Sequence, residues 1–566
     1  MKSPYGGDVT KTLLQDPQAK FQAYNPAWKE WSLHWGEPED GYFLSQDEYI
    51  IRKDMSMLAD AGIDLLFLDV TNGVMYWDEW EALFRTMEKM IAEGNKVPKM
   101  CFWAYNGKPV NVVNKLYEKI YKPGRYKDLW FRWDGKPLLC YNANPSVDAN
   151  GKYELNEQYN PEIFDFFTLR NLWWGYYMWN DKRYVGADDA WCFGYELNDP
   201  NVARLSPKER AAHHNGRPEQ MAVTPAQHSI SATGKSWRIP TGEPKLGIYD
   251  MPDSAYVPWL GKTVADPTGY GIYFQDRWDE ALSVDPDLIY LNDWNEWTAG
   301  KYMNPLIQQN GDTVQIGFLG RENEFYFVDQ YNAEFNRTMQ PMKGGYTDNF
   351  YMQLVQNMRR YKGVRPIPVE KKRRSMKIDG KFDDWNKIAT EFRDTRGDVA
   401  HRDHDGYGGL HYTNTSGRND ILVSKVSLDK KNAYFYVRTD SAITPATDPN
   451  WMLLFINTDS DQRTGWYGYN LMLDNKQASS QGKTAVMRYE NGKWIKVAEV
   501  SYAVNGNQME LSVPLKLLNP GKEIGQFDFK WADNPKALDT VIDLCTDGDT
   551  APNRRFNYRY KWNYKK

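Results

Sequence analysis

Residues 45–69 read SQDEYIIRKDMSMLADAGIDLLFLD, and this stretch decides the fold. Ser45 and Glu48 have the spacing of a capping box, which predicts a helix that begins here. Apolar residues follow at helical spacing, and Gly62 is typical of a helix end. Leu65–Leu68 is a short continuous apolar run, which indicates a strand buried on both faces, as in a parallel sheet.

The helix-then-strand unit recurs along the first part of the chain. Repetition of this kind predicts a parallel sheet with right-handed crossovers, and a (β/α)₈ TIM-type barrel over residues 1–363 fits the length. A doubly wound sheet is the alternative, but no Gly-rich phosphate loop follows any strand. Further helices are expected at 80–91, 113–120 and 350–360, and further strands at 100–104, 137–141, 166–169, 221–224 and 288–291.

The first strand of such a barrel is the weak point of the pattern. The segment before residue 45 contains no clean apolar run, so the first strand is either missing from this chain or disguised. The first residues, MKSPYGGDVTKTLLQD, also lack the apolar core of a secretory signal. We expect an incomplete amino terminus to account for both observations.

The texture of the sequence changes after residue 363. Residues 364–375 carry two prolines and five basic residues, which predicts an extended linker. The more specific alternative is a polybasic binding patch. From 376 to 566 the apolar residues alternate with period two, in short runs that Asn-Gly and Asp-Gly pairs separate. This pattern predicts an antiparallel β-sandwich, which we expect to be a binding or spacer domain rather than a second catalytic domain.

Composition excludes several classes of protein. The 70 basic and 75 acidic residues give a net charge of −5, which leaves no electrostatic footprint for nucleic acid. No run of about 18 apolar residues is present, so no membrane span is expected. The four cysteines lack metal-ligand spacing and are too few for a disulfide scaffold, so we expect buried thiols.

Aromatic residues are unusually frequent: 23 Trp, 38 Tyr and 23 Phe make 15 % of the chain. Tyr and Trp combine a flat apolar face with a polar tip, and this combination suits sugar rings. A large core built from big side chains would give the same composition.

The active site of a (β/α)₈ barrel lies at the carboxyl ends of its strands, so polar residues there are the candidates. Neither a Ser-His-Asp order with a nucleophile elbow nor a His-Glu-x-x-His helix is present. What remains is carboxylates among aromatics. The residues expected to line a substrate pocket are Trp103, Tyr105, Tyr141, Arg170, His228, Asp293, Trp294 and Asn295.

Glu296 and Asp69 are the candidate catalytic residues. Cleaving a glycosidic bond takes one carboxyl group to protonate the leaving oxygen and a second to activate water or to attack. Trp294 and Trp297 frame Glu296, and Asp69 leaves the strand that neighbours the last one once a barrel closes. Asp69 could instead cap the next helix or pair with Arg170. Four further carboxylates are weaker candidates for a catalytic role: Glu37, Glu196, Asp276 and Asp293.

Two motifs of the first part resemble a family of glycan enzymes. Asn292–Trp297, NDWNEW, resembles the Trp-Asn-Glu-Trp signature of endo-α-mannosidase-like and WbsX-like barrels, and Phe67–Asn72 resembles their second-strand motif. Residues 327–336 and 341–345 are similar to stretches of related bacterial polysaccharide-degrading proteins. The resemblance implies a (β/α)₈ barrel and glycan substrates over residues 24–363, without fixing retention or inversion.

The last part resembles a family-9-like carbohydrate-binding module, through residues 378–385 and 455–466. Asp459 and Asp461 lie in a tight loop that could offer oxygen ligands to Ca²⁺, the one candidate metal site; a hairpin turn without metal is the alternative. Trp466, Tyr467 and Tyr469 could stack on sugars or lie in the sandwich core, and the core is the preferred expectation.

The sequence therefore predicts a glycoside hydrolase that acts on a polysaccharide or complex glycan and requires no cofactor. A non-catalytic glycan-binding protein on the same barrel is the main alternative. A glycosyl-transfer enzyme is the third, but the phosphate loop or metal-holding acidic pair that it usually needs is not evident. Because polymeric glycans lie outside the cytoplasm, a periplasmic or secreted location is expected.

Overall fold

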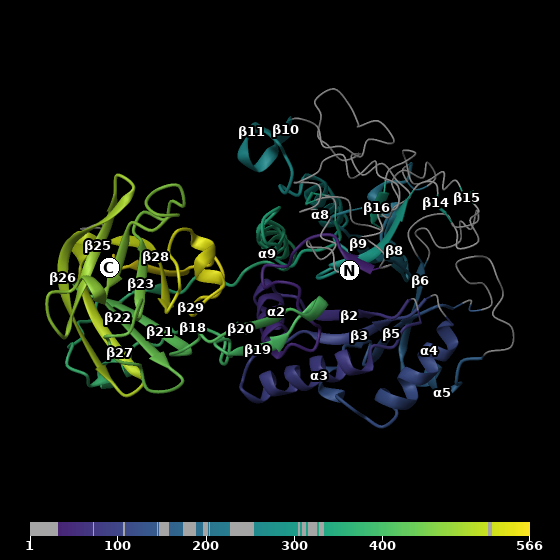
Figure 1. Ribbon diagram of the computed structural model, residues 1–566, viewed down its shortest axis with the longest axis horizontal. Helices are drawn as coiled ribbons and strands as arrows, with labels where there is room; N and C mark the ends of the chain where they lie inside the picture. The colour runs from purple at the N-terminus through teal and green to yellow at the C-terminus, as the bar shows by residue number, and fades with distance from the viewer. Residues whose placement is uncertain are drawn as a thin grey trace.

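The structure is a computed structural model that describes most of the chain from Ser32 onward. The residues outside the description are 1–31, 72, 106–107, 144, 146–157, 174–187, 196–201, 203, 227–253, 304–305, 308–312, 315–324, 328–332, 335, 519–522 and 566. Two parts follow one another along the chain, a parallel α/β part and a β-sandwich (Figure 1).

The first part is built on parallel strands that form a curved sheet. Five strands pair in the order β2-β3-β5-β6-β7, and β12 pairs in parallel with β9, which the antiparallel β8 (Ala212–His214) extends. The parallel strands are β2 (Leu65–Asp69), β3 (Lys99–Trp103), β5 (Lys136–Tyr141), β6 (Thr168–Trp173), β7 (Ala190–Cys192), β9 (Arg217–Val223) and β12 (Leu288–Leu291).

Helices cover the outer face of this sheet. Apolar residues of β3 and β5 alternate between a core shared with the helices, which holds Phe102 and Leu139, and an inner core, which holds Trp103 and Cys140. This alternation is why the strands read as continuous apolar runs. The principal helices are α2 (Glu48–Ala61), α3 (Trp77–Ala92), α4 (Pro109–Leu116), α8 (Ile272–Val284) and α9 (Asn349–Lys362), with short helices α5 (Glu162–Phe166) and α7 (Pro207–Arg210).

Two local expectations are wrong. The cap of α2 is Asp47, whose side chain accepts a hydrogen bond from the Tyr49 backbone, rather than Ser45. Both have the oxygen that a cap needs, and only Asp47 directly precedes the first helical residue. The strand expected at 166–169 begins at Thr168 instead, because Phe166 ends α5.

The first strand does not complete a barrel. β1 (Ser32–His34) pairs antiparallel with β13 (Thr298–Met303), and in the described part of the chain no strand lies between β2 and β12. Over the residues that the structure describes, the parallel strands form a curved sheet of the TIM-like type, and closure into an eightfold barrel is not seen there. Short strands complete this part: β4 (Arg132–Trp133), β10 (Ser254–Val257), β11 (Lys262–Ala265), β14 (Leu306–Ile307), β15 (Thr313–Val314) and β16 (Phe325–Phe327).

The second part is a β-sandwich whose two layers share the long strand β26 (Lys493–Asn505). β26 pairs with β25 along its first half and with β27 along its second, so one hydrogen-bonded path joins both layers around the apolar core. The other strands are β17 (Val369–Glu370), β18 (Phe392–Arg393), β21 (Ile421–Leu428), β22 (Asn432–Thr439), β23 (Leu453–Asn457), β24 (Leu471–Asp474), β25 (Lys483–Glu490), β27 (Gln508–Pro514), β28 (Ile524–Asp533), β29 (Asp549–Ala551) and β30 (Tyr558–Asn563).

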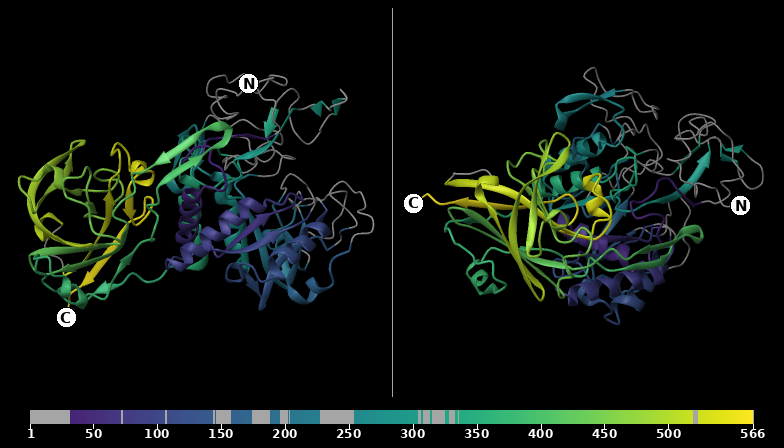
Figure 2. Two further views of the ribbon diagram at one scale, coloured as in Figure 1. Left: turned by 60° about the horizontal axis from the view of Figure 1, so that its bottom comes forward. Right: turned by 60° about the vertical axis from the view of Figure 1, so that its left-hand side comes forward.

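The two parts are tied together by buried ion pairs. A hairpin of β19 (Arg402–Asp405) and β20 (His411–Asn414) reaches from the sandwich along the first part (Figures 1 and 2). Its Arg402 pairs with Asp47 at 2.7 Å, with both side chains almost fully buried. Within the expected linker 364–375, β17 already pairs with β30 of the sandwich.

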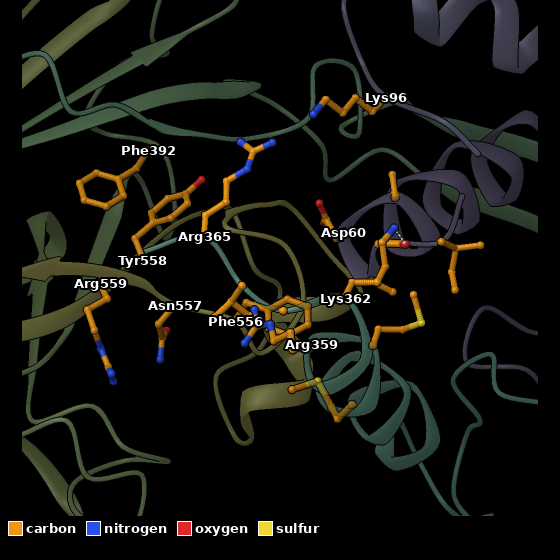
Figure 3. Close-up of a pocket in the computed structure, with 18 of the residues that line it drawn as sticks. Asp60, Lys96, Arg359, Lys362, Arg365, Phe392, Phe556, Asn557, Tyr558 and Arg559 are labelled. Atoms are coloured by element: carbon orange, nitrogen blue, oxygen red, sulfur yellow. Dashed lines mark hydrogen bonds between the residues drawn. The ribbon is translucent and has the colours of Figure 1, made fainter. Parts of the chain in front are cut away.

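A cleft of about 1860 Å³ lies between the two parts, beside α9 (Figure 3). Asp60, Arg359 and Lys362 line it from the first part, and Tyr558 and Arg559 from the sandwich. Among the described helices, none has the length and apolar character that a membrane crossing requires. The four cysteines are free thiols, and three of them are buried as expected.

Candidate active site

The carboxyl ends of β2 and β12 bring the candidate carboxylates together. Asp69 is the last residue of β2, and Asp293 and Glu296 follow β12. All three line one cavity of about 720 Å³ between these strands. Parallel strands end at the same edge of a sheet, which is why residues far apart in sequence meet here.

Tyr290 of β12 lies at the centre of this group. Its ring is 5 % exposed and stacks on Trp103 with centroids 4.3 Å apart. Burial raises the pKa of Tyr290 well above its usual value, and the nearby negative charges of Asp293 and Asp69 raise it further. The positive charge of Arg337 acts in the opposite direction. A neutral phenol is thus placed among the carboxylates, available as a hydrogen-bond donor.

Asp69 lines the cavity, and its side chain is exposed to solvent there. Its Oδ1 accepts a hydrogen bond from the Thr71 backbone at 2.7 Å. Desolvation raises the pKa of Asp69 above its usual value, although the Thr71 bonds and the charge of Arg337 act in the opposite direction. A carboxyl group in this state holds its proton more readily, which a general acid requires.

Neither alternative role for Asp69 is found in the structure. α3 begins at Trp77, so Asp69 does not cap it. Arg170 pairs with Glu219 instead.

The backbone at Glu296 is fixed by two donors. Its carbonyl oxygen accepts hydrogen bonds from Trp35 Nε1 at 2.8 Å and from Thr338 Oγ1 at 2.9 Å. The Trp35 ring also stacks on Trp297, with centroids 5.3 Å apart. The side chain of Glu296 therefore leaves a rigid backbone.

A series of buried hydrogen bonds fixes the side chain of Trp297. Its Nε1 donates to Gln340, and Gln340 Nε2 donates to Asp54 Oδ1 at 2.7 Å. Burial raises the pKa of Asp54, on α2, to about 7. Asp54 also lines the cavity, so it is a titratable group close to the candidate catalytic residues.

Sequence reasoning missed several of these residues. Tyr290 could have been found, because it lies two residues before Asn292 and alternation places both on the inner face of the strand. Trp35, Gln340 and Asp54 carried no signal, because only the folded chain brings them to the NDWNEW segment.

Of the other residues expected to line the pocket, Trp294 and Asn295 do so, whereas Trp103, Tyr105 and Tyr141 are not among the residues that line the cavity. Trp103 is buried beneath Tyr290. Tyr105 is half-buried at the end of β3, where its carbonyl accepts from Asn142. Tyr141 faces the helix layer, where its ring contacts Tyr159.

The structure does not bring Arg170 to the pocket. Its guanidinium donates to Glu219 through Nε at 2.7 Å and Nη2 at 2.6 Å, and both side chains are at most 5 % exposed. Asp134 and Asp189, which precede β5 and β7, are its next acidic neighbours. Arg170 thus lies toward the amino ends of the strands, where it serves an internal ion pair.

The remaining candidates lie elsewhere. His228 and Glu196 are outside the described residues. Glu37 pairs with Lys343 at 3.3 Å, and Asp276 lies on α8 and does not line the cavity.

Groups of the same loop donate hydrogen bonds to the carboxylates of Asp459 and Asp461. Asp459 accepts from the Asp461 backbone and from Thr464 Oγ1, and Asp461 accepts from the Arg463 guanidinium at 2.7 Å. The Arg463 hydrogen bonds hold the pKa of Asp461 at about 2. Calcium here stays a prediction. Trp466 and Tyr469 are buried in a second sandwich cluster, as preferred from the sequence, whereas Tyr467 is 49 % exposed and contradicts that expectation.

Comparison with known proteins gives matches among solved structures. The GH99 endo-alpha-mannosidase from Bacteroides thetaiotaomicron matches with 14 % identity and a TM-score of 0.32, over 58 % of this chain and 88 % of that one. A family 9 carbohydrate-binding module from Caldicellulosiruptor kristjanssonii matches with 11 % identity and a TM-score of 0.21, over 35 % of this chain and 95 % of that one. They fall on the first and last parts, the order that the sequence resemblance gave. No family model and no curated protein matches.

Proposed function

We propose that this protein is a glycoside hydrolase acting on a polysaccharide or complex glycan. The observation that carries the proposal is that Asp69, at the carboxyl end of β2, and Glu296, after the carboxyl end of β12, line one aromatic-lined cavity that runs along both strands. Asp69, with its raised pKa, is the group that protonates the leaving oxygen. Glu296, on its fixed backbone, is the second carboxylate, which activates water or attacks the sugar.

The surroundings of the two carboxylates suit a sugar substrate. Trp294 contributes an aromatic wall to the cavity, and Tyr290 lies among the charged groups. Aromatic faces pack on the C–H faces of sugar rings, and a buried phenol can donate to a hydroxyl or ring oxygen. Since glycan polymers lie outside the cytoplasm, we further propose a periplasmic or secreted location.

The test is a screen of the purified full chain against a polysaccharide panel that includes α-mannan, the class implied by the sequence resemblance. Released reducing ends report cleavage, and retardation in glycan-containing native gels reports binding. Asp69→Asn should lower release by about 10²- to 10⁴-fold, the usual contribution of general acid–base catalysis. Asp165→Asn, at an exposed position on α5, is the matched control and should leave release unchanged.

Retardation without release on any glycan would favour a non-catalytic glycan-binding protein. Release that survives Asp69→Asn would remove Asp69 from the mechanism while leaving the enzyme class intact.

A further inference from the structure

Three aspartates of the sandwich meet at its boundary with the first part. Asp394 follows β18, Asp398 lies four residues on, and Asp549 begins β29. One carboxylate oxygen of each lies within 4.8 Å of the others. Two oxygens that bind the same Ca²⁺ at about 2.4 Å are at most about 4.8 Å apart, so this spacing suits a shared ion. We propose that Asp394, Asp398 and Asp549 form a calcium site.

Oxygens without hydrogen-bond partners point to a ligand at this place. Asp394 Oδ2 and Asp398 Oδ1 are buried and accept no hydrogen bond. Asp420, outside the set of three and 8 % exposed, has a buried Oδ1 in the same condition. Its Oδ2 accepts from the Gly397 backbone, and its charge is the strongest electrostatic influence on Asp398, so it faces the group. Buried carboxylate oxygens normally have partners, and a cation supplies one.

The local charge balance leaves room for a divalent ion. Lys530 is a buried cation whose charge acts on Asp394, and its Nζ donates to the carbonyls of Pro552 and Phe556. Asp60 of α2 adds a further negative charge from the first part, at the edge of the cleft in Figure 3.

The donor set favours calcium over a transition metal. The donors are carboxylate oxygens, which suit hard cations. Asn553 Nδ2 lies 2.7 Å from Asp398 Oδ2, and a rotation of its amide would present Oδ1 as another ligand. An adjoining cavity of about 60 Å³, lined by Asp398, Asp549 and Asn553, has room for about two waters at about 30 Å³ each. These waters can complete the six to eight ligands of Ca²⁺.

An ion here would strengthen the junction between the two parts. The loop that carries Asp394 and Asp398 is held by the first part, because Asn95 exchanges two hydrogen bonds with the backbone of Arg396. The proposed site thus joins a loop resting on the first part to β29 of the sandwich. Bound calcium should raise the thermal stability of the whole chain.

The test uses the full chain after EDTA treatment and dialysis. Titration calorimetry with CaCl₂ should show one saturable site that MgCl₂ does not fill with comparable affinity. Calcium at about a hundred times its dissociation constant should raise Tm by several degrees, because it binds the folded state. Asp398→Asn and Asp549→Asn should each lower the calcium affinity at least tenfold and abolish the Tm shift.

Asp461→Asn is the matched control, because Asp461 belongs to the other candidate loop and should leave calcium binding unchanged. Loss of binding in Asp461→Asn alone would place the ion in that loop and overturn the proposal. The proposal would also be overturned if the EDTA-treated wild-type chain showed neither heat of binding nor a Tm shift with calcium. In that case protons and Lys530 would neutralise the three aspartates. If Asp398→Asn or Asp549→Asn fails to fold, Asp461→Asn still decides between the two candidate sites, because binding that survives in it excludes the Asp461 loop.

Discussion

Glu219→Gln tests the assignment of Arg170 to an internal ion pair. The Glu219 carboxylate accepts two hydrogen bonds from Arg170, one from Trp191 Nε1 at 2.7 Å and one from Trp133 Nε1 at 3.2 Å. The substitution removes the charge opposite a guanidinium that is 5 % exposed. Breaking a buried pair from one side costs about 3–5 kcal/mol.

The expected loss lies at the lower end of that range. The introduced glutamine keeps one carbonyl oxygen for the tryptophan donors, so we expect about 3 kcal/mol. At about 2–4 °C per kcal/mol for a large domain, the Tm of the first part should fall by about 6–12 °C. Differential scanning calorimetry of the full chain measures this, and it resolves the two parts if they unfold separately.

The double variant Arg170→Met with Glu219→Gln supplies the control. It removes both charges and keeps a side-chain oxygen for the tryptophan donors, so it should be less destabilised than Glu219→Gln alone. Glycan release per folded molecule should remain that of the wild type, because the pair lies toward the amino ends of the strands. A Glu219→Gln chain with unchanged Tm and lost glycan binding would refute this reasoning and return Arg170 to the substrate pocket.

Three further predictions follow from other contacts. Burial alone would raise the pKa of Glu39, but Arg554 and Lys53 hold it at about 2, below its unfolded value of 4.5. This pair therefore stabilises the junction fully above pH 4.5 and is lost as the pH falls toward 2; acid unfolding followed by circular dichroism should show this dependence weakened in Glu39→Gln. Trp35→Phe removes a hydrogen-bond donor to the Glu296 carbonyl. If this loss raises the free energy of the transition state by about 1–2 kcal/mol, kcat should fall about fivefold to thirtyfold. KM should be unchanged in steady-state assays. Thr338→Val removes the other donor and should act in the same direction; a change in KM alone in either variant would contradict a positioning role.

Much of the parallel sheet could be predicted from sequence because its strands are short and continuously apolar. β2, β3, β5 and β12 lie where the runs at 65–68, 100–104, 137–141 and 288–291 placed them. The role of β1 could not be predicted, because three residues carry no periodicity and the partner of β1 is distant in sequence.

The candidate site was predictable as far as strand ends determine it. Asp69 and Glu296 were expected together because parallel strands end at one edge, and they line one cavity. Alternation shows which face of a strand Arg170 occupies but not at which end its partner lies, and Glu219 comes 49 residues later. The aspartates at 394, 398 and 549 have no motif spacing, so their meeting is visible only in the folded chain.

The most direct test of the central claim is single-turnover release of reducing ends by Glu296→Gln, with enzyme in excess over a glycan that retards the wild type. Excess enzyme separates the chemical step from binding and product release. We expect the rate to fall at least about 100-fold while retardation persists, and Glu88→Gln, at an exposed position on α3, to match the wild type. Release by Glu296→Gln at the wild-type rate would contradict the account.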